Sequence, residues 1–383
     1  MTPVFYNPLD PEVHADPYPH YRRLREEDPV HLSLMGYWVL SRYEDVAALV
    51  RDPRLGHELH GAMDGASMLF RDPPAHTRLR SLVSRAFTPR MLERLKPRIR
   101  DIVDRSLSRA RETGELDVIA DLAFPLPATV ISEMLGLPIE DHRKVRRWGA
   151  ALARTLDPVM DPDDMTAIGT ASMEFSSYLS EQVARRKAEP RDDLLTALLA
   201  AEQEGDRLTS MELLTTVELL FVAGHETTTN LIGNGFLALL RNQDQLRRLR
   251  DEPALLRSGI EELLRYDSPV QFLIRTVKDP VTVGGRNLAR GDSALLLVGA
   301  ANRDPAAFPE PDVLDVGRPD VRHLSFGGGI HFCLGSALAR MEGQIAIGAL
   351  VSLFEEFKFG ADSLQWREHI NLRGLESLPV RAA

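Results

Sequence analysis

Apolar positions along this chain recur mainly at the three- and four-residue spacing of amphipathic helices, and only short runs read as strands. Proline and glycine punctuate the pattern without forming a linker, so we expect one domain over residues 1–383. The predicted elements are a strand at 37–40, a helix at 44–51, mostly helix across 89–204 with a break at 116–124, a helix at 253–266, short strands within 269–298, a loop at 302–320 and a last helix at about 334–354. The pattern therefore predicts a mainly α-helical fold with a minor β-sheet region.

The longest predicted helix begins at a capping box, in which Thr209 accepts from the backbone and Glu212 reaches back to it. The apolar pattern then continues to about Leu240, and roughly 30 residues at 1.5 Å each give a helix of ~45 Å that would cross the whole molecule. Its middle, residues 223–230, reads AGHETTTN, and one glycine with three threonines weakens the helix propensity. Polar residues at the centre of a buried helix break a local rule, and such breaks tend to mark functional sites.

Composition narrows the class of protein. The chain has 46 Lys plus Arg against 56 Asp plus Glu, a formal net charge of −10, so we expect no nucleic-acid partner, which would require a basic surface. A single cysteine excludes an intramolecular disulfide and a cysteine-rich metal cluster. No run approaches the roughly 18 consecutive apolar residues of a membrane span, and the first residues lack the regions of a signal peptide. We expect a cytoplasmic protein without a membrane partner.

The segment around the only cysteine, residues 326–335, reads FGGGIHFCLG. Three glycines allow a tight turn and a close approach of the main chain to a flat ligand. Cys333 stands just before the last predicted helix, where free backbone N–H groups stabilise a thiolate and lower the pKa of the thiol. A thiolate held in this way is suited to binding a metal. The alternative is a buried structural cysteine, which is the more common role of a lone cysteine.

This stretch resembles, position by position, the haem-binding loop of the cytochrome P-450 family. The resemblance extends over nearly the whole chain and implies that family's fold, a triangular helical prism with haem between a long central helix and the helix after the cysteine loop. It implies that Cys333 is the metal ligand, a thiolate that pushes electron density onto the iron of haem b. Phe326, Gly327 and Gly335 would contact the cofactor.

The centre of the long helix resembles the family's oxygen-binding signature. Ala223 and Gly224 leave room for a group beside the helix, and Glu226 and Thr227 place an acid beside a hydroxyl. Reduction of bound O2 needs protons, which a hydroxyl fed by a carboxylate can deliver, so the resemblance makes these two residues catalytic. The alternative for Thr227 is a hydrogen bond to the carbonyl four residues earlier, which would open the helix into a pocket. His225 is interpreted as a structural or solvent-linked residue, not as an iron ligand.

Two further groups of residues match the family. The haem propionates need cations, and the matching positions are His76, Arg80, Arg275 and His331. Alone, each of these would be interpreted as a solvated surface charge. The motif E-x-x-R places Glu262 and Arg265 on one helix face. The resemblance implies that they form a buried structural network with Arg318.

The resemblance also implies an apolar substrate pocket. The expected lining residues are Leu219, Val222, Ala223, Val270, Gln271, Leu273 and Leu372. For each of them, ordinary core packing is the alternative. The loop at about 55–69, with Gly61, Met63 and Gly65, is expected to be a mobile entrance, and the segment near 152–173 is expected to border the pocket.

The implied function is a monooxygenase that inserts one atom of O2 into an apolar small molecule, by hydroxylation or epoxidation of a natural product, terpenoid, steroid, macrolide or fatty acid. Electrons would come from a ferredoxin with its reductase, or from a flavodoxin-type donor. Seven basic residues could form the docking patch, or a solvated helix face: Arg78, Arg85, Arg90, Arg94, Lys96, Arg98 and Arg100. The rival functions are a peroxide-driven peroxygenase and a non-catalytic haem-thiolate recruitment module. We expect a monomer.

Overall fold

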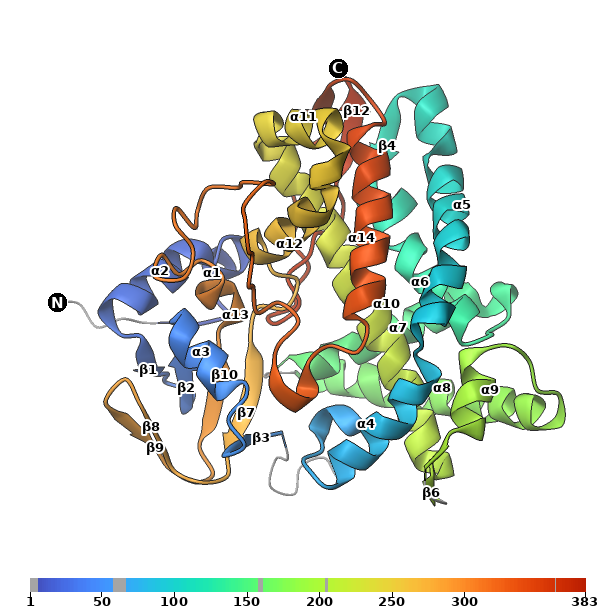
Figure 1. The fold of residues 1–383 in the computed structure, drawn as a ribbon, viewed down its shortest axis with the longest axis horizontal. Helices are drawn as coiled ribbons and strands as arrows, with labels where there is room; N and C mark the ends of the chain where they lie inside the picture. Colours follow the sequence, from blue (N-terminus) through green and yellow to red (C-terminus); the bar gives the residue numbers. More distant parts are fainter. Residues whose placement is uncertain (1–5, 58–66, 158–160, 204–205, 362) are drawn as a thin grey trace.

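A computed structural model describes residues 6–57, 67–157, 161–203, 206–361 and 363–383. The chain forms a large helical part and a smaller part built around a β-sheet, and helix α10 runs through the helical part (Figure 1). The α-helices are α1 (Pro11–Ala15), α2 (Tyr18–Glu27), α3 (Tyr43–Leu49), α4 (Ala75–Ala86), α5 (Pro89–Thr113), α6 (Pro125–Met134), α7 (His142–Ala153), α8 (Pro162–Ala188), α9 (Leu194–Ala200), α10 (Ser210–Arg241), α11 (Gln243–Asp251), α12 (Leu256–Tyr266), α13 (Val298–Ala301) and α14 (Ser336–Val351). The mainly helical fold class is confirmed.

The strands are short and belong to small sheets. They are β1 (Val30–Leu32), β2 (Tyr37–Leu40), β3 (Leu55–Gly56), β4 (Glu115–Asp117), β5 (Glu202–Gln203), β6 (Asp206–Arg207), β7 (Leu273–Val277), β8 (Val281–Val283), β9 (Arg286–Leu288), β10 (Ser293–Leu296), β11 (Phe357–Phe359) and β12 (Pro379–Ala382). The largest sheet has the order β1-β2-β10-β7-β3, in which β10 runs parallel to β2 and every other pair is antiparallel. A second sheet has the order β11-β12-β4 and ties the C-terminus to the end of α5.

Most elements lie where the sequence pattern predicts them. The predicted strand 37–40 is β2, and the predicted break at 116–124 is β4 followed by a π-helical turn, Val118–Ala123. The helix predicted at 253–266 starts with a 3-10 turn, and the predicted loop at 302–320 has no helix or strand. The last helix, α14, begins two residues later than predicted, at Ser336, because the chain from Cys333 to Gly335 is still in a loop and turn.

Helix α10 is continuous over 32 residues and starts at the predicted capping box: the Thr209 hydroxyl accepts from the Glu212 N–H, and the Glu212 carboxylate accepts from the Thr209 N–H. The Thr227 and Thr229 hydroxyls donate to carbonyls four residues earlier, as the alternative for Thr227 predicts. The expectation that such bonding opens the helix is wrong, because the helix stays intact. Packing supports it, since a Cβ at Gly224 would lie 3.3 Å from Ile131 of α6. Tertiary contacts therefore override weak local propensity.

The main hydrophobic core surrounds α10 and includes side chains of α5, α6, α7, α8, α12 and α14. Two smaller clusters lie against the five-stranded sheet. In the described part of the chain, none of the helices combines the length and apolar character needed to cross a membrane.

Candidate functional site

A cavity lies between the centre of α10 and the loop that precedes α14, and the empty space in it, with the part that is open to solvent, amounts to about 1420 Å³. Its walls are mainly apolar, with the sulfur-bearing Cys333 on one side and Thr227 of α10 also lining it. Basic side chains gather along another part of the wall, at Arg80 and Arg275.

The cysteine loop has the shape that its glycines predict. Gly327 and Gly329 have φ values of +67° and +63°, a region of backbone space that other residues rarely adopt. The Cys333 N–H donates to the Phe326 carbonyl at 3.0 Å, which closes the loop. The Phe326 ring lies 4.4 Å from the Arg340 guanidinium, measured from the ring centre. Phe326, Gly327, Cys333 and Gly335 all line the cavity.

Burial raises the pKa of the Cys333 thiol, although the backbone of Gly335 and Ser336 and the charge of Arg80 and Arg340 act to lower it. The expectation that the position before α14 gives a net lowering is therefore wrong for the protein chain alone. Desolvation of the thiolate outweighs the backbone groups, and a bound metal cation would supply the missing positive charge.

The predicted acid and alcohol of α10 do not meet. Ala223, Gly224 and Thr227 line the cavity, and the Thr227 hydroxyl donates to the Ala223 carbonyl at 3.0 Å. Glu226 is not among the described residues that line the cavity. It is buried, with 3% of its side chain exposed, and its Oε2 accepts from Arg367 Nη1 at 2.6 Å. The Glu226 carboxylate is thus held by a residue of a distant segment and not by the hydroxyl beside it in the sequence.

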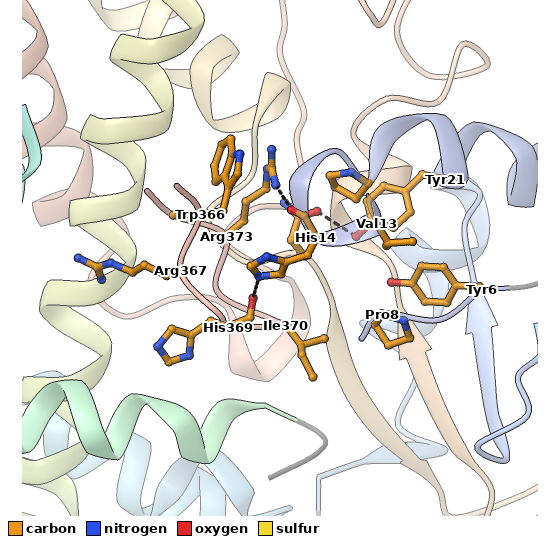
Figure 2. A pocket seen from close by; sticks show the side chains of 13 residues that line it. Tyr6, Pro8, Val13, His14, Tyr21, Trp366, Arg367, His369, Ile370 and Arg373 are labelled. Carbon is orange, nitrogen blue, oxygen red and sulfur yellow. Dashed lines mark hydrogen bonds between the residues drawn. The ribbon is translucent and has the colours of Figure 1, made fainter. Parts of the chain in front are cut away.

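Glu226 belongs to a buried charge network. Burial would raise its pKa, but the hydrogen bond and charge of His225, with the charges of Arg367 and His369, lower it to about 2. His225 Nε2 lies 3.2 Å from Glu226 Oε1, and its Nδ1 donates to the Phe221 carbonyl at 2.8 Å, so His225 is structural, as expected. Arg367 comes from a C-terminal loop beside a second, smaller pocket, and its guanidinium extends toward α10 (Figure 2).

The basic wall of the cavity contains the four predicted cation positions. His76 and Arg80 come from α4, Arg275 from β7 and His331 from the cysteine loop. His76 Nδ1 and His331 Nε2 are buried, and neither has a hydrogen-bond partner among the described residues. Burial lowers the pKa of His331 to about 3, and the positive charges of His76 and Arg275 add to this effect. Burial also lowers the pKa of His76, with a smaller contribution from the charge of Arg80. Neutral imidazole donors beside two guanidinium groups suit a carboxylate ligand.

Glu262, Arg265 and Arg318 lie in contact with one another, as the resemblance implies. Arg265 donates to both oxygens of Glu262, at 2.7 and 2.8 Å, and neither side chain is exposed. Arg318 Nε lies 3.1 Å from Glu262 Oε2. Arg265 also donates to the carbonyls of Asn302 and Pro311, so the network fastens α12 to the loop that leads to the cysteine.

The predicted substrate residues divide into two groups. Leu219, Ala223, Val270 and Leu273 line the cavity. Val222, Gln271 and Leu372 are not among the described residues that do so. Val222 follows Leu219 by three positions but lies in the helical core, and Leu372 is 1% exposed there. Gln271 points to the smaller pocket, where the Tyr21 hydroxyl donates to it.

The expected entrance loop lies largely outside the described residues, including Gly61, Met63 and Gly65. Its described end contributes Met68 and Leu69 to the cavity wall. In the segment near 152–173, residues 158–160 also lie outside the description. None of its described residues lines the cavity.

The predicted basic patch is partly neutralised by local ion pairs. Arg78 pairs with Asp206 and Glu212, and Arg94 pairs with Asp192 at 2.7 Å. Arg98 pairs with Glu133 at 2.6 Å. These contacts favour a helix surface stabilised by its own carboxylates over a uniformly positive docking surface.

Among the residues near the site that the sequence did not predict, three are titratable. His57, after β3, and Glu342, on α14, both line the cavity, and Arg367 holds Glu226. Glu342 could have been found, because it is an acidic residue within a mainly apolar helix. His57 and Arg367 stand in segments without a motif, so only the folded chain places them.

The residues present fit haem. In the described part of the chain, no group of three or more His, Cys, Asp or Glu side chains could hold a metal ion. A metal held by Cys333 would therefore need its other ligands from a non-protein group, as iron has in a porphyrin. The unpartnered donors of His76 and His331 would suit the propionates of that porphyrin.

Comparison with known proteins agrees with this geometry. The family model described as Cytochrome P450 matches residues 38–363. The chain is 44% identical to Cytochrome P450 107B1 of Saccharopolyspora erythraea over 97% of this chain and 96% of that protein, and 42% identical to the Vitamin D(3) 25-hydroxylase of Pseudonocardia autotrophica over 95% and 93%. The crystal structure of CalO2 superposes with a TM-score of 0.93 at 38% identity, covering 100% of this chain and 99% of that one. This chain therefore belongs to the cytochrome P450 family of haem-thiolate monooxygenases.

Proposed function

We propose that this monooxygenase holds haem b through Cys333 and inserts one atom of O2 into an apolar small-molecule substrate. The observation that carries the proposal is the cavity itself, in which a lone thiol, an α10 hydroxyl and unpartnered imidazole donors line one space. Use of haem and of O2 follows from the family. The identity of the haem and the roles of individual residues are our proposal.

The residues in and beside the cavity would have separate tasks. Cys333 would ligate the iron, and haem would supply the oxidising power while the protein orients the substrate and handles protons. Thr227 would hold a water or a proton at its hydroxyl, inside the cavity. Glu226 would have to leave Arg367 to reach Thr227, because its carboxylate is now held by the C-terminal loop. The ion pair would therefore control proton delivery.

The apolar side chains that line the cavity indicate the class of substrate. Met68, Leu69, Ile131, Leu219 and Val270 give the cavity an apolar surface, so hydrocarbon parts of a substrate would be bound by desolvation. The relative named Vitamin D(3) 25-hydroxylase points to the same chemistry, since vitamin D(3) is an apolar molecule. Hydroxylation or epoxidation of such a molecule is the reaction we propose.

Electrons would come from a separate protein, as in related enzymes. We propose a ferredoxin with its reductase, or a flavodoxin-type donor, docking on the cysteine side. Ile330 and Phe332 of the cysteine loop are 53% and 43% exposed there, and an apolar contact of this kind favours a short-lived complex close to Cys333.

The first prediction tests the metal ligand. Cys333→Ala removes the thiolate, so the ferrous carbon monoxide complex should lose the absorption band that a thiolate ligand produces. Thr227→Ala is the matched control, because it changes the cavity but not the ligand. It should keep that band while a larger share of the electrons is released as hydrogen peroxide. A Cys333→Ala spectrum identical to that of the parent protein would refute the proposed ligand.

A further inference from the structure

His57 has a position on the basic wall that no motif indicates. It directly follows strand β3, and β3 pairs antiparallel with β7 so that Gly56 lies opposite Thr276. The next step of that register brings His57 beside Arg275. The His57 backbone N–H donates to Asp72 Oδ1 at 3.2 Å, which fixes the chain at this point. Two segments about 220 residues apart in sequence are thereby joined at the cavity.

The His57 side chain extends a row of imidazoles. Its ring centre lies 4.2 Å from that of His331, and the His331 ring lies 4.1 Å from that of His76. All three side chains line the cavity. His57 Nε2, like His76 Nδ1 and His331 Nε2, is buried and has no hydrogen-bond partner in the described ranges. A neutral imidazole can carry its proton on that nitrogen. Leaving one such buried donor unpaired costs about 1–3 kcal/mol, so three on one wall indicate a missing acceptor.

The charges around this wall define the acceptor. Arg80 and Arg275 add two cations. Asp72 is the carboxylate close by, and it is already engaged by the His57 N–H and by Lys278 Nζ at 3.3 Å. Burial holds the pKa of His57 well below its usual 6.5, and the charges of Arg275, His331 and His76 act in the same direction. The ring is therefore neutral and has one N–H to donate. An anionic acceptor with several oxygens satisfies the donors and the cations together.

We propose that His57 donates from Nε2 to a haem propionate, as a third imidazole beside His76 and His331. This inference rests on the proposed haem site and adds a binding residue that lies outside the haem motifs. The two propionates offer four oxygens, and the wall offers donors from three imidazoles and two guanidinium groups. His57 would thus secure the cofactor from the sheet, whereas Cys333 secures it from the helical part.

Two variants separate the hydrogen bond from the packing. His57→Phe keeps an aromatic ring against His331 but removes the donor, and His57→Gln removes the ring but keeps an N–H. His20→Ala is the control, because His20 lies on α2 and is not among the described residues that line the cavity. Haem loss is measured by transfer from the purified holoprotein to excess apomyoglobin. The propionate bending band is recorded by resonance Raman spectroscopy.

His57→Phe should lose haem at least about tenfold faster than the parent and shift the propionate band, because a hydrogen bond to a charged group is worth 1.5–3 kcal/mol. The rate of haem loss from His57→Gln should lie between those of the parent and His57→Phe. His20→Ala should match the parent in both measurements. Haem loss and a propionate band equal to those of the parent in His57→Phe would overturn the proposal. If His57→Phe fails to fold, His57→Leu takes its place, because leucine also lacks a donor. Haem loss and a propionate band equal to those of the parent in His57→Leu would overturn the proposal.

The carbon monoxide spectrum distinguishes this inference from the proposed function. A parent protein without a thiolate-type band would refute the haem site itself. A normal band with no effect of His57→Phe would refute only the role of His57.

Discussion

Two buried carboxyl groups, Glu226 on α10 and Glu342 on α14, differ in protonation state. Glu226 is an anion, because His225 and Arg367 compensate its burial. Glu342 is 1% exposed, and neither of its oxygens has a hydrogen-bond partner in the described part of the chain. Burial raises its pKa to about 8, and only the Thr228 hydroxyl opposes the shift. At neutral pH the cavity wall therefore carries a neutral carboxylic acid, and environments that separate two pKa values in this way often separate acid and base roles.

The raised pKa of Glu342 makes a prediction about stability. The unfolded chain releases this proton near pH 4.5 and the folded chain only near pH 8, so Glu342 costs stability increasingly as the pH rises between these values. Glu342→Gln keeps the size and removes the titration. Its unfolding free energy should exceed that of the parent by an amount that grows by up to about 1.4 kcal/mol per pH unit. Urea unfolding at pH 5, 6, 7 and 8 measures the difference.

The control for this experiment is Glu355→Gln, which removes an exposed carboxyl group after α14. It should leave the pH dependence of stability as in the parent. Parallel curves for the parent and Glu342→Gln would contradict a neutral Glu342.

At the scale of elements, α10 shows how a helix with a weak centre is held in place. Its capping box fixes the start, and its middle is stabilised by packing against α6, α7, α12 and α14. The cap also serves the site: the Glu212 carboxylate that completes it pairs with Arg78 of α4, the helix that carries His76 and Arg80. The start of α10 and the helix of the basic wall are thus fastened together.

The cap leads to a prediction at this scale. Thr209→Ala removes the side-chain acceptor of the Glu212 N–H, and because Thr209 is exposed no core packing is lost. The unfolding free energy should fall by about 1 kcal/mol, with the carbon monoxide spectrum unchanged. Thr209→Ser keeps the acceptor and should be close to the parent in urea unfolding. Equal losses in both variants would show that the hydroxyl is not the stabilising group.

At the scale of the whole molecule, the cysteine loop depends on a segment that comes much earlier in the chain. The Glu262 carboxylate accepts from Arg265, Arg318 and the Asp315 N–H. Arg265 in turn holds carbonyls of the 302–313 region. The buried pair thus sets the path of the chain that enters the cysteine loop.

Removing one partner of this pair should be costly. Arg265→Met leaves the Glu262 carboxylate buried without its main partner, which should lower the unfolding free energy by about 3–5 kcal/mol. The matched control is Arg105→Met, which breaks an exposed pair with Asp101 and should cost less than about 1 kcal/mol. Both are measured by urea unfolding of the purified protein. A loss of similar size in the two variants would contradict the buried role.

The sequence by itself determined the helical class, the cap and length of α10, the glycine turn of the cysteine loop and the Glu262–Arg265 pair. These features act between residues that are close in the chain, where helix periodicity and left-handed glycines leave few alternatives. Only the tertiary structure decided that Glu226 turns to Arg367, which lies 141 positions away, that His57 joins His331, and that Gln271 faces another pocket. Side-chain direction and protonation depend on desolvation and on charges from distant segments, and these arise only when the chain is folded.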